Sequence, residues 1–393
     1  MIPKRILPAI VFAQFAGTSL WFAGNAIITD LRIPMDVGIE DVGIATSAVQ
    51  LGFITGTMLF ALFSIADRYS PRKLFLVCSI LGAISNLLIY FIAYNLFSLL
   101  VIRFITGFFL TGIYPIGMKI ASGWYKKDLG NAIGLLVGAL VLGTAFPHLI
   151  KSFGGSVPWE KVIFIISVFS IVGGITMYVF VPDGPYISSG TKFNPNAILT
   201  IFKFKALRSS AFGYFGHMWE LYTFWALIPV ILISYLKLNS AELNIPLWSF
   251  IIIACGTFGC VMGGVISKRI GSAKVALIQL LLSGICCLVS PLMFSTSIPL
   301  FLSFLILWGI VVAGDSPQYS AIIALSAPKE LVGSGLTLVN SIGFAITILS
   351  LWFVYQFLGI IDVSYALMIL GVGPIFGLIS MKNLVFSKLK ILT

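Results

Sequence analysis

Long apolar segments alternate with short polar breaks along the whole chain. Each apolar segment holds about 20 residues, the length that an α-helix needs to cross the hydrocarbon core of a membrane. The pattern therefore predicts an all-α membrane protein with twelve spanning helices. The predicted spans are 6–28, 42–66, 74–94, 98–122, 130–150, 161–182, 211–236, 246–267, 274–294, 298–325, 333–357 and 364–382.

Composition agrees with this pattern. The chain is 59% hydrophobic and 9% charged, with a mean hydropathy of +1.08. A soluble protein carries roughly 25% charged residues. Too little polar surface remains to face water, so the lipid bilayer is the expected surrounding. The first apolar run, which follows Lys4 and Arg5, is too long for a cleaved signal peptide and is interpreted as the first helix.

The basic residues predict the orientation of the helices. If both termini are cytoplasmic, 19 of the 24 Lys and Arg residues fall on cytoplasmic segments and four on the other side, while Arg103 lies within a helix. Positive residues gather on the cytoplasmic side of membrane proteins. We therefore expect a multi-pass protein of the plasma (inner) membrane with cytoplasmic termini. The same asymmetry accounts for the net charge of +11 without a nucleic-acid partner.

Two features recur about 200 residues apart. The charged segment 67–73 is repeated as 268–274, with an offset of 201 residues, and the pattern G-x4-G-x2-P occurs at 107–115 and again at 309–317, with an offset of 202. Matched features between the same pairs of helices indicate a duplication. We predict two six-helix bundles, residues 1–182 and 211–393, that are related by a pseudo-two-fold axis and joined by a cytoplasmic linker over 183–210.

The repeated loop also carries a family resemblance. Asp67-Arg68-Tyr69-Ser70-Pro71-Arg72-Lys73 resembles the loop between helices 2 and 3 of the major facilitator superfamily, with Ser70 in place of the usual glycine. Arg103-Phe-Ile-Thr-Gly107 resembles the family's R-x-x-x-G pattern in helix 4. The resemblance covers essentially the whole chain. It implies the two-bundle fold of that family, transport by alternating access, and a central cavity lined by helices 1, 4, 7 and 10.

The loop residues are candidates for a gate. Asp67 is expected to approach the N-terminal end of the helix at 333–357, where free N–H groups and the helix dipole favour an anion. The basic residues around it also satisfy the orientation rule, so topology alone can explain them. The predicted gating residues are Asp67, Arg68, Arg72, Lys73 and Arg269.

Ionisable residues inside the spans are candidates for the transport pathway, because each costs roughly 2.5–3.5 kcal/mol to insert. Glu220 lies near the middle of helix 211–236, with His217 on the same face. A carboxyl group there can couple transport to H⁺, or it can form hydrogen bonds with a neighbouring helix in a structural role. Arg103 can bind an anionic substrate, pair with an acid or extend to the membrane surface.

Further pathway candidates come from helices 1 and 10. Asp315 and Gln318 lie at the proline break of helix 10, where Asp315 either accepts hydrogen bonds from freed N–H groups or lines the pathway. Gln14, Trp21 and Asn25 are seven and four residues apart, a spacing that places them on one face of a continuous helix.

Together these features predict a secondary transporter of a small solute, which we expect to be a monomer. Arg103 makes organic anions the first substrate class to consider, and H⁺ is the expected coupling ion. The sequence has no G-x-x-x-x-G-K-[ST] motif for ATP and no visible constellation for an enzyme, a cofactor or a metal. A drug or metabolite exporter and a membrane sensor related to transporters are the alternatives; the glycine–proline motif of antiporters is only partly matched at 134–147.

Overall fold

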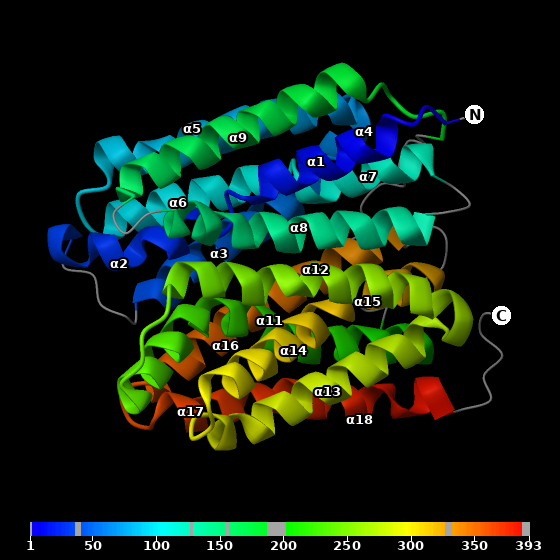
Figure 1. The fold of residues 1–393 in the computed structure, drawn as a ribbon. Helices are drawn as coiled ribbons and strands as arrows, with labels where there is room; N and C mark the ends of the chain where they lie inside the picture. Colours follow the sequence, from blue (N-terminus) through cyan, green and yellow to red (C-terminus); the bar gives the residue numbers. More distant parts are fainter. Residues whose placement is uncertain are drawn as a thin grey trace.

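A computed structural model of the chain describes residues 2–35, 41–125, 129–153, 157–186, 202–326 and 332–386. The described residues are almost entirely helical and form two layers of long helices that run along a common direction (Figure 1). Eleven helical segments are long and apolar enough to cross a membrane, and one apolar helix, Ile6–Thr18, is shorter. The prediction of an all-α membrane protein is confirmed.

The first half of the chain supplies one bundle. Its helices are α1 (Ile6–Thr18), α2 (Ala23–Met35), α3 (Asp41–Leu62), α4 (Ile65–Arg68), α5 (Pro71–Ile92), α6 (Leu96–Leu110), α7 (Tyr114–Trp124), α8 (Leu129–Ser152) and α9 (Trp159–Phe180). α1 begins at the right-hand end of the molecule in Figure 1, and α18 of the second half ends there. We call this the terminal end and the other the opposite end.

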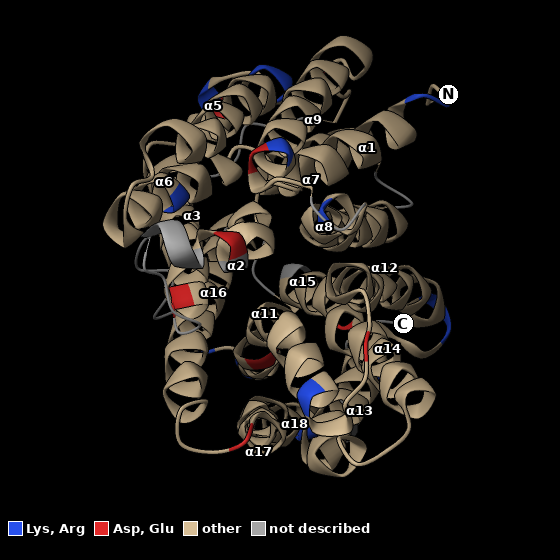
Figure 2. Ribbon diagram, turned by 60° about the vertical axis from the view of Figure 1, so that its left-hand side comes forward, with Lys and Arg blue, Asp and Glu red and all other residues tan. Residues whose placement is uncertain are grey.

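The second half supplies the other bundle. Its helices are α11 (Lys205–Asn239), α12 (Ile245–Ile270), α13 (Ser272–Met293), α14 (Ile298–Gly314), α15 (Ser316–Ser326), α16 (Val332–Phe357), α17 (Val363–Ala366), the 3₁₀ turn η2 (Leu367–Gly371) and α18 (Val372–Phe386). α11 begins six residues earlier than predicted, because Leu207 and Ser210 are already buried against the bundle. Most of the ribbon in Figure 2 carries no charged residue, as a lipid environment requires.

Five predicted spans are not single α-helices: the second is interrupted over 63–64, between α3 and α4, the twelfth consists of α17, the 3₁₀ turn η2 and α18, and three more are broken within their length. The first span is interrupted over 19–22, between α1 and α2; the fourth over 111–113, between α6 and α7; and the tenth at 315, between α14 and α15. The last two breaks fall within the repeated G-x4-G-x2-P pattern, where the proline cannot donate a backbone hydrogen bond. The break in the first span contains no proline and was not predicted.

Glycines allow the closest helix contacts in both bundles. A Cβ atom added at Gly107 of α6 would lie 1.9 Å from the carbonyl oxygen of Val49 in α3. In the second bundle, a Cβ atom at Gly309 of α14 would lie 2.1 Å from the carbonyl oxygen of Ile252 in α12. The first glycine of the repeated pattern therefore has the same function in both halves, which is to let two helix backbones touch.

Candidate functional site

A small cavity lies between the two bundles. It is walled by α7 and α8 of the first half and by α11, α14, α15 and α16 of the second. Its volume is about 20 Å³, enough for about one water molecule. Its lining residues are Tyr114, Val137, Leu140, Val141, Tyr214, Met218, Leu221, Tyr222, Trp225, Ala313, Ser316 and Phe344.

The cavity lies where the helices of the repeated pattern are broken. Tyr114 is the first residue of α7 and Ser316 the first residue of α15, and each precedes the proline of its break. The two positions are 202 residues apart, the offset of the duplication. Equivalent breaks in the two halves therefore present a tyrosine and a serine to the same cavity.

Aromatic rings join the two halves beside the cavity. Trp21 stacks on Tyr222 with ring centroids 5.6 Å apart and on Phe344 with centroids 5.5 Å apart. Phe53 of α3 approaches Phe344 at 4.8 Å, and Phe22 approaches Trp225 at 6.3 Å. Trp21, Phe22 and Phe53 belong to the first half and their partners to the second, so this aromatic layer forms a contact between the two bundles.

A buried pair of ionisable groups lies next to the cavity. His217 Nδ1 is 2.8 Å from Asp315 Oδ1, and both side chains are 1% exposed. The ring of Tyr214, which lines the cavity, is 5.8 Å from the His217 ring, and Asp315 directly precedes the cavity residue Ser316. Sequence analysis named both members of the pair but not their contact, which joins α11 to the break between α14 and α15.

Glu220 points away from the cavity into the second bundle. Its Oε1 accepts hydrogen bonds from Trp308 Nε1 of α14 at 2.7 Å and from two residues of α13, the Ser283 hydroxyl and, at 3.3 Å, the Cys287 thiol. Glu220 is 1% exposed. These hydrogen bonds with neighbouring helices agree with a structural role for Glu220, which is one of the two roles predicted for it.

Arg103 binds the backbone of the segment that separates α1 from α2. Its guanidinium group donates to the carbonyl oxygen of Leu20 at 3.1 Å and to that of Trp21, both freed where α1 ends before α2 begins. The side chain is fully buried, so it does not extend to the membrane surface. Within the described residues it forms no ion pair with an acid, and it does not line the cavity.

The predicted common face of Gln14, Trp21 and Asn25 is wrong, because the helix is interrupted between Gln14 and the other two. Gln14 faces α7, where a Cβ atom at Gly117 would lie 2.0 Å from its Oε1. Asn25 Nδ2 instead donates to Thr46 Oγ1 of α3 at 2.7 Å. All three are buried, but only Trp21 reaches the second half.

Gln318, the remaining pathway candidate, is buried on α15 with its amide nitrogen facing Gly263 of α12. This position lies within the second bundle. Among the residues predicted for the pathway, none lines the cavity of the described structure itself, although Trp21, His217 and Asp315 adjoin lining residues.

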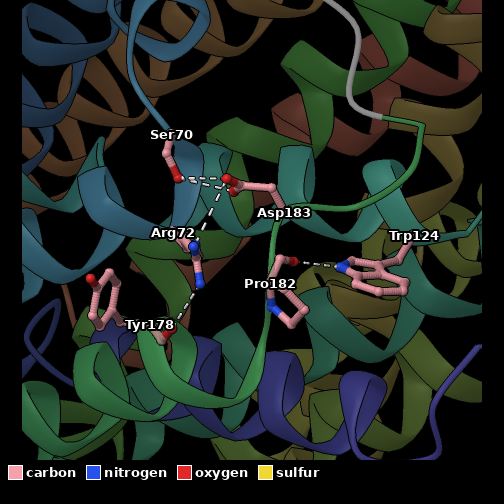
Figure 3. Close-up of polar contacts among 6 residues, drawn as sticks. All are labelled: Ser70, Arg72, Trp124, Tyr178, Pro182 and Asp183. Atoms are coloured by element: carbon pink, nitrogen blue, oxygen red, sulfur yellow. Dashed lines mark hydrogen bonds and ion pairs between the residues drawn. The ribbon is translucent and has the colours of Figure 1, made fainter.

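Two predicted gate residues form contacts within the first bundle. Asp67 forms an ion pair with Lys119 of α7, which also donates to the carbonyl oxygen of Ala66 at 2.6 Å. Arg72 Nε lies 3.8 Å from the Asp183 carboxylate, which accepts a hydrogen bond from Ser70 at 2.9 Å (Figure 3). The serine that replaces the family's glycine therefore binds the residue at the start of the linker.

The same linker segment has two further attachments. Trp124 Nε1 donates to the carbonyl oxygen of Pro182 at 2.9 Å (Figure 3), and the Tyr186 backbone N–H donates to the Gly123 carbonyl oxygen at 3.0 Å. Residues 182–186 are thus held against the ends of α5 and α7. Most of the predicted linker, 187–201, lies outside the described residues.

The remaining gate candidates, Arg68, Lys73 and Arg269, are exposed. The predicted approach of Asp67 to the N-terminal end of α16 stays a prediction, since residues 327–331 before that helix lie outside the described residues. A gate role for any of these residues also stays a prediction.

Other contacts between the halves lie at the middle and at the opposite end. Thr257 Oγ1 of α12 donates to the Gly138 carbonyl oxygen of α8 at 3.0 Å. At the opposite end, Asn244 Nδ2 donates to the Ser152 carbonyl oxygen at 3.4 Å. There too the Tyr355 ring packs on Gly43, where a Cβ atom would lie 2.7 Å from it. The opposite end is therefore closed.

Sequence analysis missed the cavity-lining residues Tyr114, Tyr214 and Ser316. A usable signal was present for two of them, because Tyr114 and Ser316 occupy the same position of the repeated G-x4-G-x2-P pattern. The pattern indicates a duplication but does not by itself specify which way its residues face.

Comparisons with known proteins agree with this architecture. The Major Facilitator Superfamily model matches residues 6–351. The chain is 23% identical over 256 residues to the "Probable sulfoacetate transporter SauU" of Cupriavidus necator, covering 59% of this chain and 58% of that protein. It is 24% identical over 182 residues to the "Putative transporter AraJ" of Escherichia coli, covering 46% and 45%. The match spans about half the length of these curated relatives.

Solved structures share the fold at low sequence identity. The proton:xylose symporter XylE superimposes with a TM-score of 0.71 at 12% identity, covering 96% of both chains. The human organic anion transporter MFSD10 superimposes with a TM-score of 0.70 at 15% identity, covering 96% of this chain and 100% of that one. A bacterial homologue of the lysosomal transporter Spinster, solved in an inward-facing conformation, gives 0.67 at 15% identity, covering 97% and 96%.

Proposed function

The chain belongs to the major facilitator superfamily and is a membrane transporter, and we propose that it moves a small organic anion together with H⁺ by alternating access. In this proposal the terminal end is the cytoplasmic side of the plasma membrane, because 19 of the 24 basic residues would then lie on cytoplasmic segments. The active unit is a single chain.

The observation that carries the proposal is the small cavity between the two halves. At about 20 Å³ it has no room for an organic solute. A solute can enter only if the bundles separate, and the contacts at Gly43, Ser152 and Trp21 close the opposite end. Rocking of two similar bundles about a central site is the general form of alternating access. The structure then corresponds to a state closed toward the outside.

Support for an anionic solute comes from the relatives and from the charges near the cavity. One relative is named as a sulfoacetate transporter and one fold neighbour as an organic anion transporter. No acidic residue lines the cavity within the described part of the chain, and the nearest acid, Asp315, is paired with His217. An entering anion therefore meets no unbalanced negative charge.

For proton coupling we favour the His217–Asp315 pair over Glu220. The pair adjoins two cavity residues, whereas Glu220 is turned away and already accepts three hydrogen bonds. Adding one proton to a neutral pair leaves a net positive charge beside the cavity, which favours an anion there. Proton uptake and anion binding would then support each other, as cotransport requires.

Counterflow in liposomes tests the transport proposal. Purified protein is reconstituted into vesicles loaded with unlabelled sulfoacetate, and labelled sulfoacetate is added outside; a panel of small carboxylates and sulfonates is treated in the same way. We expect transient accumulation of label for at least one anion, and stronger accumulation when the receiving compartment is alkaline. Absence of counterflow across the panel, with intact binding, would instead favour the sensor alternative.

A further inference from the structure

We propose that the cavity binds the oxyanion head of the substrate through the N-terminal end of α7 and through the neutral donors Tyr114, Ser316 and Trp225, and not through Arg103. This inference rests on the proposed function, because it names the residues that select an anion at the transport site. It goes beyond the sequence-based expectation, in which Arg103 was the group that would attract an anion.

Two helix N-termini meet at the cavity. α7 and α15 each have 11 residues, and their first residues, Tyr114 and Ser316, line it. The N-terminal end of a helix carries a partial positive charge and unpaired backbone N–H groups, both of which favour an anion. Asp315, which precedes α15, is balanced by His217 at 2.8 Å. At α15 the Ser316 N–H lies against the Asp315 carboxylate, Pro317 has no N–H, and the Gln318 N–H donates to the Asp315 carbonyl oxygen at 2.9 Å, so the α7 end is the one that favours an anion at the cavity.

Trp225 provides independent support. Its side chain is fully buried and lines the cavity, and its indole N–H has no hydrogen-bond partner. The indole nitrogen can only donate, so any group that satisfies it must be an acceptor. Leaving a buried donor unpaired costs free energy that a ligand oxygen would recover.

The other polar groups at the cavity are donors as well. Tyr114, Tyr214, Tyr222 and Ser316 line the cavity, and their hydroxyl groups form no hydrogen bond within the described residues. The remaining wall is aliphatic, with Val137, Leu140 and Val141 on one side. A compact head rich in acceptor oxygens, carried on a short apolar skeleton, matches this lining.

Arg103 is unavailable for such a head. Its two terminal nitrogens donate to the carbonyl oxygens of Leu20 and Trp21, which have no helical partners at the break, and its Nε, which has no hydrogen-bond partner within the described residues, faces Gly24 of α2 and not a residue that lines the cavity. Moving it to a ligand would leave those carbonyl groups unpaired in a buried site. Arg103 is therefore a positioning residue that fixes Trp21 in the aromatic layer.

The aromatic rings at the cavity also allow one competing ligand class. Tyr114, Tyr214, Tyr222 and Trp225 together resemble the aromatic cages that hold quaternary ammonium ions. Such a ligand would gain nothing from the α7 end and would leave the Trp225 donor unpaired. We therefore favour the anion and make the ammonium ion an explicit outcome of the test.

The test compares matched small probes on purified full-length protein in detergent, without any gradient. The probes are propionate and ethanesulfonate, their uncharged counterpart propionamide, and tetramethylammonium. Binding is measured by titration calorimetry and by the shift in unfolding temperature. We expect one or both anions to bind and the other two probes to bind at least tenfold more weakly. Tighter binding of tetramethylammonium or propionamide, or binding of no probe at all, would overturn the inference.

Single substitutions then test whether each proposed donor contributes to anion binding. Tyr114→Phe, Ser316→Ala and Trp225→Phe each remove one donor, and we expect each to weaken anion binding by about tenfold, typical of one hydrogen bond to a charged group. Tyr90→Phe and Trp352→Phe make the same chemical changes at exposed positions and serve as controls. Wild-type affinity in all three cavity variants, with normal unfolding temperatures, would contradict the assignment.

The two proposals fail in different ways. If anions bind through these residues but no anion shows counterflow, the binding site is correct and the transport proposal is wrong. If an anion shows counterflow with wild-type kinetics in the three cavity variants, transport is correct and this site is wrong.

Discussion

Trp21 stacks on Tyr222, with ring centroids 5.6 Å apart, and this contact joins the two halves of the transporter beside its central cavity. Trp21 reaches that position because the first span is broken over 19–22, and Arg103 holds the broken segment through the Trp21 carbonyl oxygen. The two bundles can separate at the opposite end only if this contact opens.

We expect Trp21→Ala to shift the protein away from the state closed at the opposite end. Removal of a large buried aromatic side chain costs about 3–5 kcal/mol, and here the loss falls on the closed state. Labelling of a cysteine placed at Asn25 by a membrane-impermeant maleimide should become faster. Trp352→Ala, which removes a tryptophan that is 62% exposed, should leave the labelling rate unchanged. Equal rates in both variants would show that Trp21 does not hold this end closed.

The repeated glycines should be equally sensitive in both halves. Gly107→Ala and Gly309→Ala each drive a methyl group into a backbone carbonyl oxygen about 2 Å away, and overpacking of this kind costs about 1–3 kcal/mol. Both variants should unfold at lower temperature in detergent. Gly264→Ala is the control, because no atom lies within 4 Å of its added methyl group, and alanine favours a helix by about 0.5–1 kcal/mol. Unchanged unfolding of Gly107→Ala would refute the close packing of α3 and α6.

The two buried acids should differ in their effect on coupling. We expect Asp315→Asn to abolish accumulation driven by a pH gradient but to retain exchange of the substrate, because the carboxyl group that takes up the proton beside His217 is removed. Glu220→Gln should retain accumulation, since its carbonyl oxygen can still accept from Trp308. Gradient-driven uptake and exchange are measured in the same liposomes. The reverse pattern would assign coupling to Glu220.

The loop between α3 and α5 gives a prediction about gating. Asp67→Asn should change the free energy of unfolding by no more than about 1 kcal/mol, since partly exposed ion pairs contribute little. It should also lower the rate of transport. Asp183→Asn removes a second exposed pair, with Arg72, and is the matched control. Wild-type transport in Asp67→Asn would exclude a gate role, and an equal loss in Asp183→Asn would point to the linker attachment instead.

Much of the fold could be predicted because hydrophobic length and charge asymmetry act locally. Apolar runs predicted twelve spans, and the proline of the G-x4-G-x2-P pattern indicated the break in helix 10. The break between α1 and α2 escaped prediction, because its partner, Arg103, lies more than 80 residues away. The candidate site was predicted less well. Polarity alone selected Gln14 and Asn25, whose amides turn to neighbouring helices.

The sequence by itself determined a multi-pass membrane transporter, because insertion into lipid depends on the length, hydropathy and charge of each segment. Only the tertiary structure decided which polar groups are already paired. The two terminal nitrogens of Arg103 donate to backbone carbonyl oxygens and Glu220 accepts from three donors, while Arg103 Nε and, at the cavity, the indole of Trp225 have no hydrogen-bond partner within the described residues. Pairing depends on helix rotation and on contacts between distant segments, and a linear pattern of residue types does not specify either one.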